Sequence, residues 1–216
     1  ASVRWSKVRQ GSSQSAESRL TVYGPRRGDP GCPGRLPDSG GRLPASGFMP
    51  GASENLGSLP PANFNMELGM HLEIPRLGLS GMPIVGVPLA DGTWDVLQLG
   101  DSAGLLQPSR APGQAGNSVI TAHVTDISGA DGPFAQLGAL AAGDNIYVHA
   151  SGQVYAYQVQ ALKEASPSDL SIFNEGAAGE PQVLMLVTCS SPNHTTHTYD
   201  SRLVVQAVMV QPTSGR

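Results

Sequence analysis

Short apolar runs with strand character, separated by glycine, proline and serine, most constrain how this chain can fold. They lie at residues 72–75, 83–88, 117–124, 145–149, 154–159, 183–189 and 203–210. Residues 91–117 and 166–181 are rich in turn residues, so we expect them to be connections with about one helical turn each. Gly132-Pro133 predicts a short helix that begins at Phe134. Six or more short strands with little helix predict a mainly β fold that forms a closed or nearly closed barrel.

Composition and charge divide the chain near residue 65. Residues 1–65 contain ten Gly and eight Pro, and they carry eight Lys or Arg against four Asp or Glu, whereas residues 66–216 carry five against thirteen. Such a Pro and Gly content without a period is typical of low-complexity segments. We therefore expect residues 1–65 to be a flexible N-terminal tail and residues 66–216 to be one folded domain. The net charge of −4 argues against a nucleic-acid-binding protein.

Three polar side chains stand at the ends of predicted buried strands. Cys189 ends one apolar run, His123 nearly closes another, and Arg202 precedes the last. Strand ends carry loops, and loops are where sites are usually built. A thiolate can act as a nucleophile, an imidazole can donate and accept protons, and a guanidinium can stabilise a carbonyl oxygen that becomes negative. Together these residues predict acyl transfer through a thioester on Cys189.

These residues and their surroundings resemble the sortases, the cysteine transpeptidases of the bacterial cell surface. The resemblance depends on Thr121-Ala122-His123, Leu186-Val187-Thr188-Cys189 and Arg202, in that order, and it covers about residues 68–211. Supporting stretches match at 72–75, 84–87, 116–118, 132–134 and 143–144. The family often has Gly where this chain has Ala122. The context of Cys189 and the absence of a long insertion fit a housekeeping-like or class D/E/F-like member better than a pilin polymerase.

The resemblance implies an eight-stranded sortase-type β-barrel with one or two short helices. It implies Cys189 as the nucleophile, His123 as the general acid and base, and Arg202 as the group that stabilises the oxyanion or a substrate carbonyl. The implied reaction cleaves a Leu-Pro-x-Thr-Gly-like sorting signal of a surface protein after Thr and transfers the product to an amine of a peptidoglycan precursor or a pilin. The implied location is the outer face of a bacterial cell membrane, with the anchor outside this sequence, and no cofactor is implied.

Other residues near the predicted site leave further interpretations open. We expect Thr121 and Thr188 to contribute to substrate binding, and His194 and His197 to line the loop where substrate or nucleophile enters. Cys189 and these two histidines also form a C-x4-H-x2-H pattern, but a closed zinc site needs a fourth ligand, so we predict no metal. The acidic residues have no calcium-loop spacing. The alternative from another class is a non-catalytic surface β-barrel, such as an adhesin domain.

Two pentapeptides in the expected tail match the sorting-signal pattern with Ser in place of Thr. They are Leu36-Pro37-Asp38-Ser39-Gly40 and Leu43-Pro44-Ala45-Ser46-Gly47. One interpretation is coincidence in a segment rich in Pro and Gly. The other is that a pentapeptide occupies the groove of its own chain or of a neighbouring molecule, as a pseudosubstrate lid or as a true self-substrate. About twenty flexible residues, 48–67, would span roughly 25 Å, which is enough to reach a groove on a small domain.

Overall fold

Strands and short 3-10 helices form the secondary structure of the residues that the computed structural model describes, which are 41–49, 66–90, 92–173 and 181–213. All of these residues belong to the unit Gly34–Arg216. The strands are β1 (Met66–Ile74), β2 (Leu79–Val87), β3 (Leu89–Ala90), β4 (Thr93–Trp94), β5 (Ala103–Leu106), β6 (Asn117–Thr121), β7 (Asn145–Ala150), β8 (Gln153–Ala165), β9 (Val183–Asn193) and β10 (Thr198–Thr213). The 3-10 helices are η1 (Pro75–Leu77), η2 (Leu137–Ala139) and η3 (Ser171–Phe173). Within the described ranges, no helix has the length and apolar character needed to cross a membrane.

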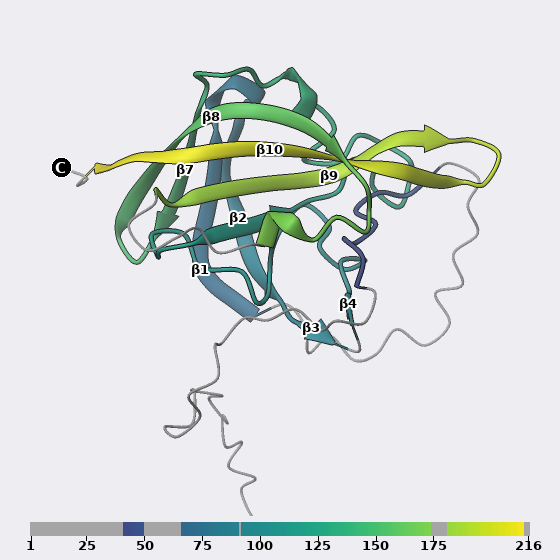
Figure 1. Cartoon of the computed structure of the whole chain (residues 1–216), viewed down its shortest axis with the longest axis horizontal. Helices are drawn as coiled ribbons and strands as arrows, with labels where there is room; N and C mark the ends of the chain where they lie inside the picture. Colours follow the sequence, from purple (N-terminus) through teal and green to yellow (C-terminus); the bar gives the residue numbers. More distant parts are fainter. Residues whose placement is uncertain (1–40, 50–65, 91, 174–180, 214–216) are drawn as a thin grey trace, which may run out of the picture. The chain divides into compact units, whose positions relative to one another are not determined.

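Eight strands close into a barrel in the order β1-β2-β5-β6-β9-β10-β8-β7 (Figure 1). Most neighbouring strands are antiparallel, but β5 runs parallel to β2 and β9 runs parallel to β6. Strands β3 and β4 form a separate two-stranded sheet. This arrangement confirms the mainly β, eight-stranded barrel that was expected from the sequence and from the resemblance.

Residues along the barrel strands alternate between two apolar clusters, because successive side chains of a strand point to opposite faces. In β9, Leu184 and Leu186 belong to an inner cluster, to which all eight barrel strands contribute. Met185 and Val187 belong to an outer cluster, which also contains Trp94 and other residues from outside the barrel strands. Position 189 continues the alternation of Met185 and Val187, so the side chain of Cys189 lies on the outer face of the barrel.

Some elements differ from what the sequence predicts. Strand β5 lies within residues 91–117, so the prediction of a connection was wrong there. Its four residues, Ala103–Leu106, are all buried and are held by parallel pairing with β2, a long-range contact that local composition does not signal. The helix predicted to begin at Phe134 is instead one 3-10 turn, Leu137–Ala139. Strands β8, β9 and β10 extend beyond the predicted apolar runs, because their polar ends pair with one another.

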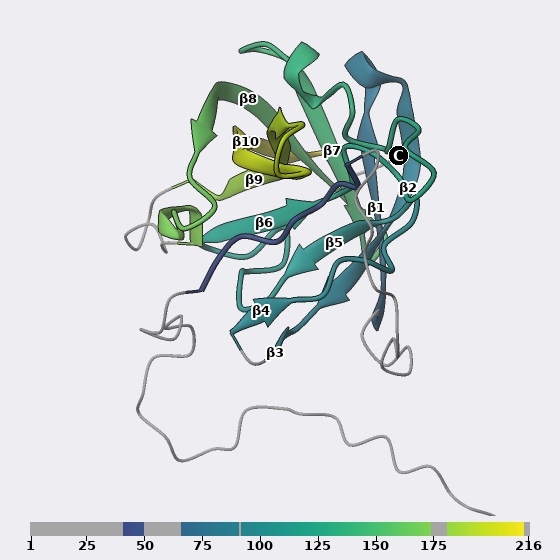
Figure 2. The same ribbon diagram turned by 90° about the vertical axis from the view of Figure 1, so that its right-hand side faces the viewer.

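Residues 41–49, which we call the docked segment, lie against the barrel near the ends of β6 and β9 (dark blue in Figure 2). Leu43 N–H donates to Pro167 O at 2.6 Å, and Val124 N–H donates to Ser46 O at 2.7 Å. The docked segment has no strand or helix of its own. It falls within the stretch 1–65 that the sequence predicts to be a flexible tail, and the rest of that stretch lies outside the described residues.

Candidate active site

The three candidate catalytic residues lie in one row across neighbouring strands. In the hairpin of β9 and β10, Cys189 and Arg202 are direct partners in the antiparallel register. Directly opposed residues of antiparallel strands have Cβ atoms about 4.5–5.5 Å apart. The parallel register of β6 and β9 ends with Thr121 opposite Val187, so two further residues along the chain bring His123 level with Cys189. The fold therefore brings a thiol, an imidazole and a guanidinium to one edge of the barrel.

Cys189 is buried, with 2% of its surface exposed. Burial raises the pKa of its thiol above the ordinary value of 9.0, and the positive charge of Arg202 opposes this shift. The Ser46 hydroxyl of the docked segment donates to Sγ at 4.0 Å. With the docked segment in place, the thiol is therefore protonated at neutral pH.

His123 is also buried, and neither ring nitrogen has a hydrogen-bond partner within the described part of the chain. Burial lowers the pKa of His123 below its ordinary value of 6.5, and backbone carbonyls, chiefly that of Ser46, oppose the shift in part. The Phe48 ring packs against the imidazole with a centroid distance of 5.2 Å. On the backbone side, Gly132 has no room for a side chain against His123, and Phe134 N–H donates to His123 O at 2.9 Å. The imidazole is thus neutral, and its packing holds it in place beside the docked segment.

Thr121 and Thr188 are buried and link β6 to β9 immediately before the two candidate catalytic residues. The Thr121 hydroxyl donates to Val187 O at 2.9 Å, and the Thr188 hydroxyl donates to Ala122 O at 2.9 Å. From the sequence, both threonines were expected to contribute to substrate binding. Their hydroxyl protons are instead used within the barrel, so the two threonines position the ends of β6 and β9.

Arg202 is buried and holds the backbone of the docked segment. Its Nε donates to Pro44 O at 2.9 Å, and its Nη2 donates to Leu43 O at 3.5 Å. Its Nη1 donates to Tyr199 O at 3.2 Å and to Ser201 O at 2.9 Å, which fixes the plane of the guanidinium. Burial lowers the pKa of Arg202, but a guanidinium remains charged at neutral pH. Arg202 therefore contacts carbonyls upstream of Ser46, as a group that binds a peptide backbone would.

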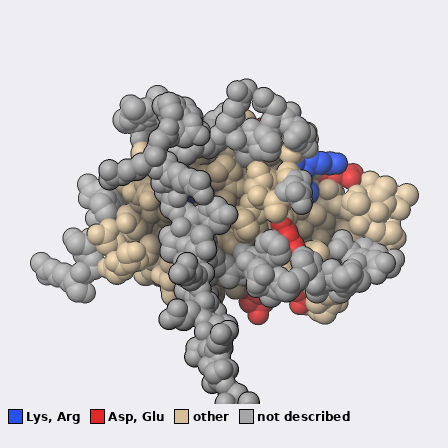
Figure 3. Space-filling view, turned by 90° about the horizontal axis from the view of Figure 1, so that it is seen from below, with Lys and Arg blue, Asp and Glu red and all other residues tan. Residues whose placement is uncertain are grey.

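The burial of the docked pentapeptide follows the pattern of its sequence. Leu43, Pro44 and Ser46 are buried, whereas Ala45, at the position that varies in a Leu-Pro-x-Ser-Gly pattern, is exposed. Leu43 belongs to the outer apolar cluster together with Trp94 and Val96. Charged side chains are sparse among the described residues in the view of Figure 3, in keeping with the 14% of charged residues in the whole chain. The groove therefore holds the pentapeptide through apolar side chains, backbone hydrogen bonds and the guanidinium of Arg202.

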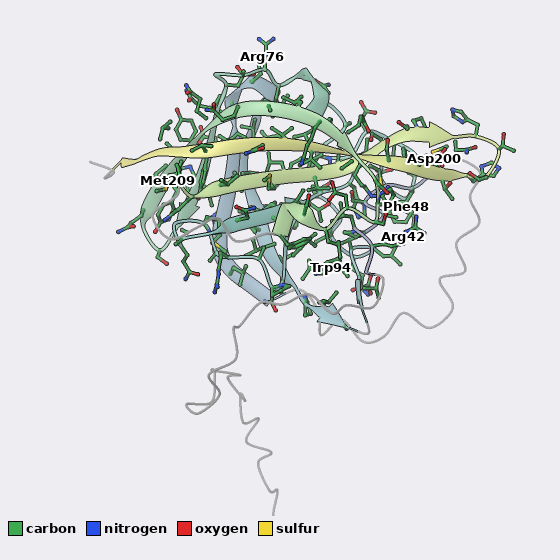
Figure 4. All side chains as sticks on the ribbon, viewed as in Figure 1. Arg42, Phe48, Arg76, Trp94, Asp200 and Met209 are labelled. Carbon is green, nitrogen blue, oxygen red and sulfur yellow. The ribbon has the colours of Figure 1, made fainter. Side chains whose placement is uncertain are left out.

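Several residues at this site were not predicted from the sequence. Val124 contributes a backbone N–H to Ser46 O, and Phe48 contributes an aromatic ring beside His123. Tyr199 places its hydroxyl 3.1 Å from Thr125 Oγ1. Figure 4 shows Phe48 and Arg42 at the end of the molecule where β10 carries Asp200. A backbone N–H donor and an aromatic ring that packs beside the site leave no recognisable signal in a sequence. For the Val124 donor alone, the position directly after His123 could have indicated a role.

Two histidines predicted for the site lie apart from it. His194 and His197 are exposed in the turn between β9 and β10, at the tip of a hairpin that projects from the barrel in Figure 1. They are therefore not part of the row formed by Cys189 and Arg202. The pentapeptide at 36–40 lies outside the described residues. Within the described ranges, no three His, Cys, Asp or Glu side chains form a group that could hold a metal ion.

Comparisons with known proteins give one family. A family model for the sortase domain matches residues 72–210. Sortase C-1 from Actinomyces oris is similar at a TM-score of 0.55 and 26% identity, covering 67% of this chain and 75% of that chain. Sortase C from Streptococcus pneumoniae is similar at a TM-score of 0.52 and 27% identity, covering 68% of each chain. The fold is also shared with a sortase D5 transpeptidase from Clostridium perfringens, at a TM-score of 0.52 and 19% identity over 66% of this chain and 78% of that chain.

A search of curated proteins found none that matches this chain. The solved structures represent more than one class of the same family, and the family model spans well over half of the chain, including all three candidate catalytic residues. The barrel has the strand order and the near absence of helix described above. The chain therefore belongs to the sortase family of cysteine transpeptidases.

Proposed function

We propose that this chain is an active transpeptidase that recognises Leu-Pro-x-Thr-Gly-like or Leu-Pro-x-Ser-Gly-like sorting signals on surface proteins. One observation carries the proposal: a Leu-Pro-x-Ser-Gly segment of the chain itself contacts Cys189 and Arg202, and Phe48, just after it, packs against His123. Its specified side chains are buried and its variable residue is exposed, as expected if the groove reads the signal and ignores x.

In the first step, Cys189 gives its thiol proton to His123, and Sγ attacks the carbonyl carbon of the Ser or Thr in the signal. The Val124 N–H, which donates to Ser46 O at 2.7 Å, would stabilise this oxygen as it becomes negative. One such donor typically contributes about 2.7–4 kcal/mol to the transition state. Arg202 would hold the two upstream carbonyls, and its charge favours the thiolate.

The carbon–nitrogen bond to Gly then breaks, and His123 returns the proton to the leaving amine. The product is a thioester between Cys189 and the Ser or Thr of the signal. In the second step an amine of a peptidoglycan precursor or a pilin gives a proton to His123 and attacks the thioester carbonyl. The new amide forms, and Cys189 leaves and recovers its proton.

We further propose that residues 1–65 act as a tail whose pentapeptide at 43–47 is a pseudosubstrate for the catalytic domain, residues 66–216. Leu43 and Ser46 are buried against the barrel, and Cys189, which the Ser46 hydroxyl contacts, is 2% exposed. An external signal would need the same pocket and the same Arg202 donors. The docked segment and a substrate would therefore exclude each other.

The proposed place of action is the outer surface of a bacterial cell. This location follows from the family, because its substrates and amine acceptors are exposed there. No cofactor is needed for the two steps, since a thiol, an imidazole and fixed N–H donors supply the nucleophile, the proton transfers and the oxyanion stabilisation.

The proposal is tested by mass spectrometry of the full chain after incubation with Leu-Pro-x-Thr-Gly and Leu-Pro-x-Ser-Gly peptides. The expected result is an adduct on Cys189 with the mass of the acyl fragment, which hydroxylamine releases, and no adduct with Cys189→Ala. The same measurement on Leu43→Ala prevents the docked segment from hiding the activity. If neither protein forms an adduct with any peptide, the chain is a non-catalytic surface barrel.

A further inference from the structure

The docked segment contains the kind of bond that the proposed reaction breaks, and the barrel holds the chain on both sides of it. On one side, Val124 N–H donates to Ser46 O at 2.7 Å. On the other side, Phe48 N–H donates to Thr125 O at 3.3 Å, and the Thr125 hydroxyl donates to Phe48 O at 2.7 Å. The peptide bond between Ser46 and Gly47 is therefore fixed against the loop that follows β6.

The groups that would break this bond lie around Ser46. Its hydroxyl donates to Sγ of Cys189 at 4.0 Å. Burial dominates the pKa values of Cys189 and His123, and the backbone of Ser46 opposes the effect of burial on each of them. Upstream, Nε of Arg202 donates to Pro44 O at 2.9 Å. The nucleophile and the base therefore lie at the residue whose carbonyl would be attacked.

The docked segment also meets the sequence requirements of a substrate. An inhibitory segment has to fill a groove, but it does not need a bond that the enzyme can cut. Both residues that flank the cleavage point of a Leu-Pro-x-Ser-Gly signal, Ser46 and Gly47, are present here. The covalent tether gives the segment a high effective concentration at the groove, so it competes with every external signal. What is proposed for an external signal therefore applies to the docked segment as well.

We propose that the docked segment is a substrate of its own chain, and that Cys189 cleaves the bond between Ser46 and Gly47. Sγ forms a bond to the carbonyl carbon of Ser46, the carbon–nitrogen bond to Gly47 breaks, and His123 carries the thiol proton to the leaving nitrogen. Water or an amine then opens the thioester, and its proton returns to Sγ. The inference rests on the proposed transpeptidase function and names a substrate within the chain itself.

Self-cleavage ends the block of the groove. While the bond is intact, the docked segment excludes other signals as a pseudosubstrate. After cleavage, the part of the chain up to Ser46 is no longer tethered, and its effective concentration at the groove falls to that of a free peptide. A cleaved chain therefore accepts external signals faster than an intact one.

The test is intact-mass spectrometry of the full chain during incubation in buffer. The expected products are residues 1–46 and residues 47–216. Added hydroxylamine should convert the first product to its hydroxamate, because it intercepts the thioester. Cys189→Ala should stay intact. The fraction cleaved over time should not depend on protein concentration, because each chain cuts itself, and a rate that rises in proportion to concentration overturns cleavage within one chain.

Leu43→Asp separates docking from catalysis. This change places a carboxylate in the outer apolar cluster, so self-cleavage should fall by about tenfold or more. Reaction of Cys189 with an external Leu-Pro-Ala-Ser-Gly peptide should rise in the same variant, because the groove is then free. Val210→Asp, a matched change at an exposed position of β10, should leave both rates within about twofold of wild type. Self-cleavage that persists in Leu43→Asp, or that appears in Cys189→Ala, overturns the inference.

The failure of this inference is distinguishable from the failure of the proposed function. If Leu43→Asp forms a thioester with the external peptide but the wild-type chain never cleaves itself, the docked segment is only a pseudosubstrate and this inference alone fails. If neither reaction occurs, both are overturned.

Discussion

Leu43→Ala should release the docked segment and expose the nucleophile. Leu43 is 2% exposed and packs in the outer cluster, so burial of almost its whole apolar surface stabilises the docked state. Leu→Ala changes at buried positions cost about 2–5 kcal/mol, and the low end applies where the alternative is release of a short segment into water. A loss of about 2 kcal/mol, at about 1.4 kcal/mol per factor of ten, shifts the docking equilibrium roughly 30-fold toward the released state.

The assay is the rate of Cys189 alkylation by iodoacetamide at constant pH, followed by peptide mapping, which separates Cys189 from Cys32. Because Cys189 is 2% exposed in the docked state, its rate should follow the released population and rise roughly 30-fold in Leu43→Ala. Ala45→Ser, an exposed change in the same segment, should stay within about twofold of wild type. Leu140→Ala controls for general destabilisation, because Leu140 is buried in the inner cluster, whereas Leu43 belongs to the outer cluster. An unchanged rate in Leu43→Ala, or an equal rise in Leu140→Ala, would refute the reasoning.

Three further predictions concern the guanidinium, pH and the core. Arg202→Lys keeps the charge but loses the donors that hold two carbonyls, so kcat/KM for a signal peptide should fall about 100-fold or more; a fall below threefold would contradict this role. Burial lowers the pKa of His123 from 6.5 and raises that of Cys189 from 9.0, so the docked state favours the neutral form of both groups. Docking should therefore weaken as the pH falls below 6.5, where His123 becomes charged, and as it rises above 9.0, where Cys189 does. The docked population can be followed by NMR of the amides of the docked segment, and a population that does not change with pH would disprove this. Tyr157→Phe leaves Gly113 N–H without its acceptor and should cost about 1 kcal/mol of unfolding free energy at pH 7. Burial raises the pKa of Tyr157 from 10.0 to about 12, so the wild type loses unfolding free energy as the pH rises through this range. The difference in unfolding free energy between wild type and variant should therefore be smaller there than at pH 7, which chemical denaturation under the two conditions can check.

Part of the site could be predicted because it depends on one hairpin. The turn between β9 and β10 sets Asn193 opposite Thr198, and the same register then sets Cys189 opposite Arg202. Strand ends and a short connection are visible in the sequence, so a thiol and a guanidinium on facing strands follow from local rules.

The place of His123 could not be derived in this way. It depends on the parallel pairing of β6 with β9, strands separated by β7 and β8 along the chain. Parallel pairs have no connecting turn to fix their register, and apolar runs such as 117–121 and 183–187 fit many partners. The expectation that His123 lies beside Cys189 came from the resemblance to the family, because the residue pattern does not determine it. The same limit explains β5, whose four residues become a strand only beside β2.

The strand-rich fold class, the order of the three candidate catalytic residues and the two sorting-signal-like pentapeptides can be read from the residues in order. Only the folded chain shows that one pentapeptide, 43–47, docks beside Cys189, that Arg202 binds its backbone, and that Thr121 and Thr188 position strands. Residue type and local spacing encode which chemistry and which backbone shape are available, whereas burial, pKa and steric exclusion arise from atoms far apart in the chain that only folding brings into contact.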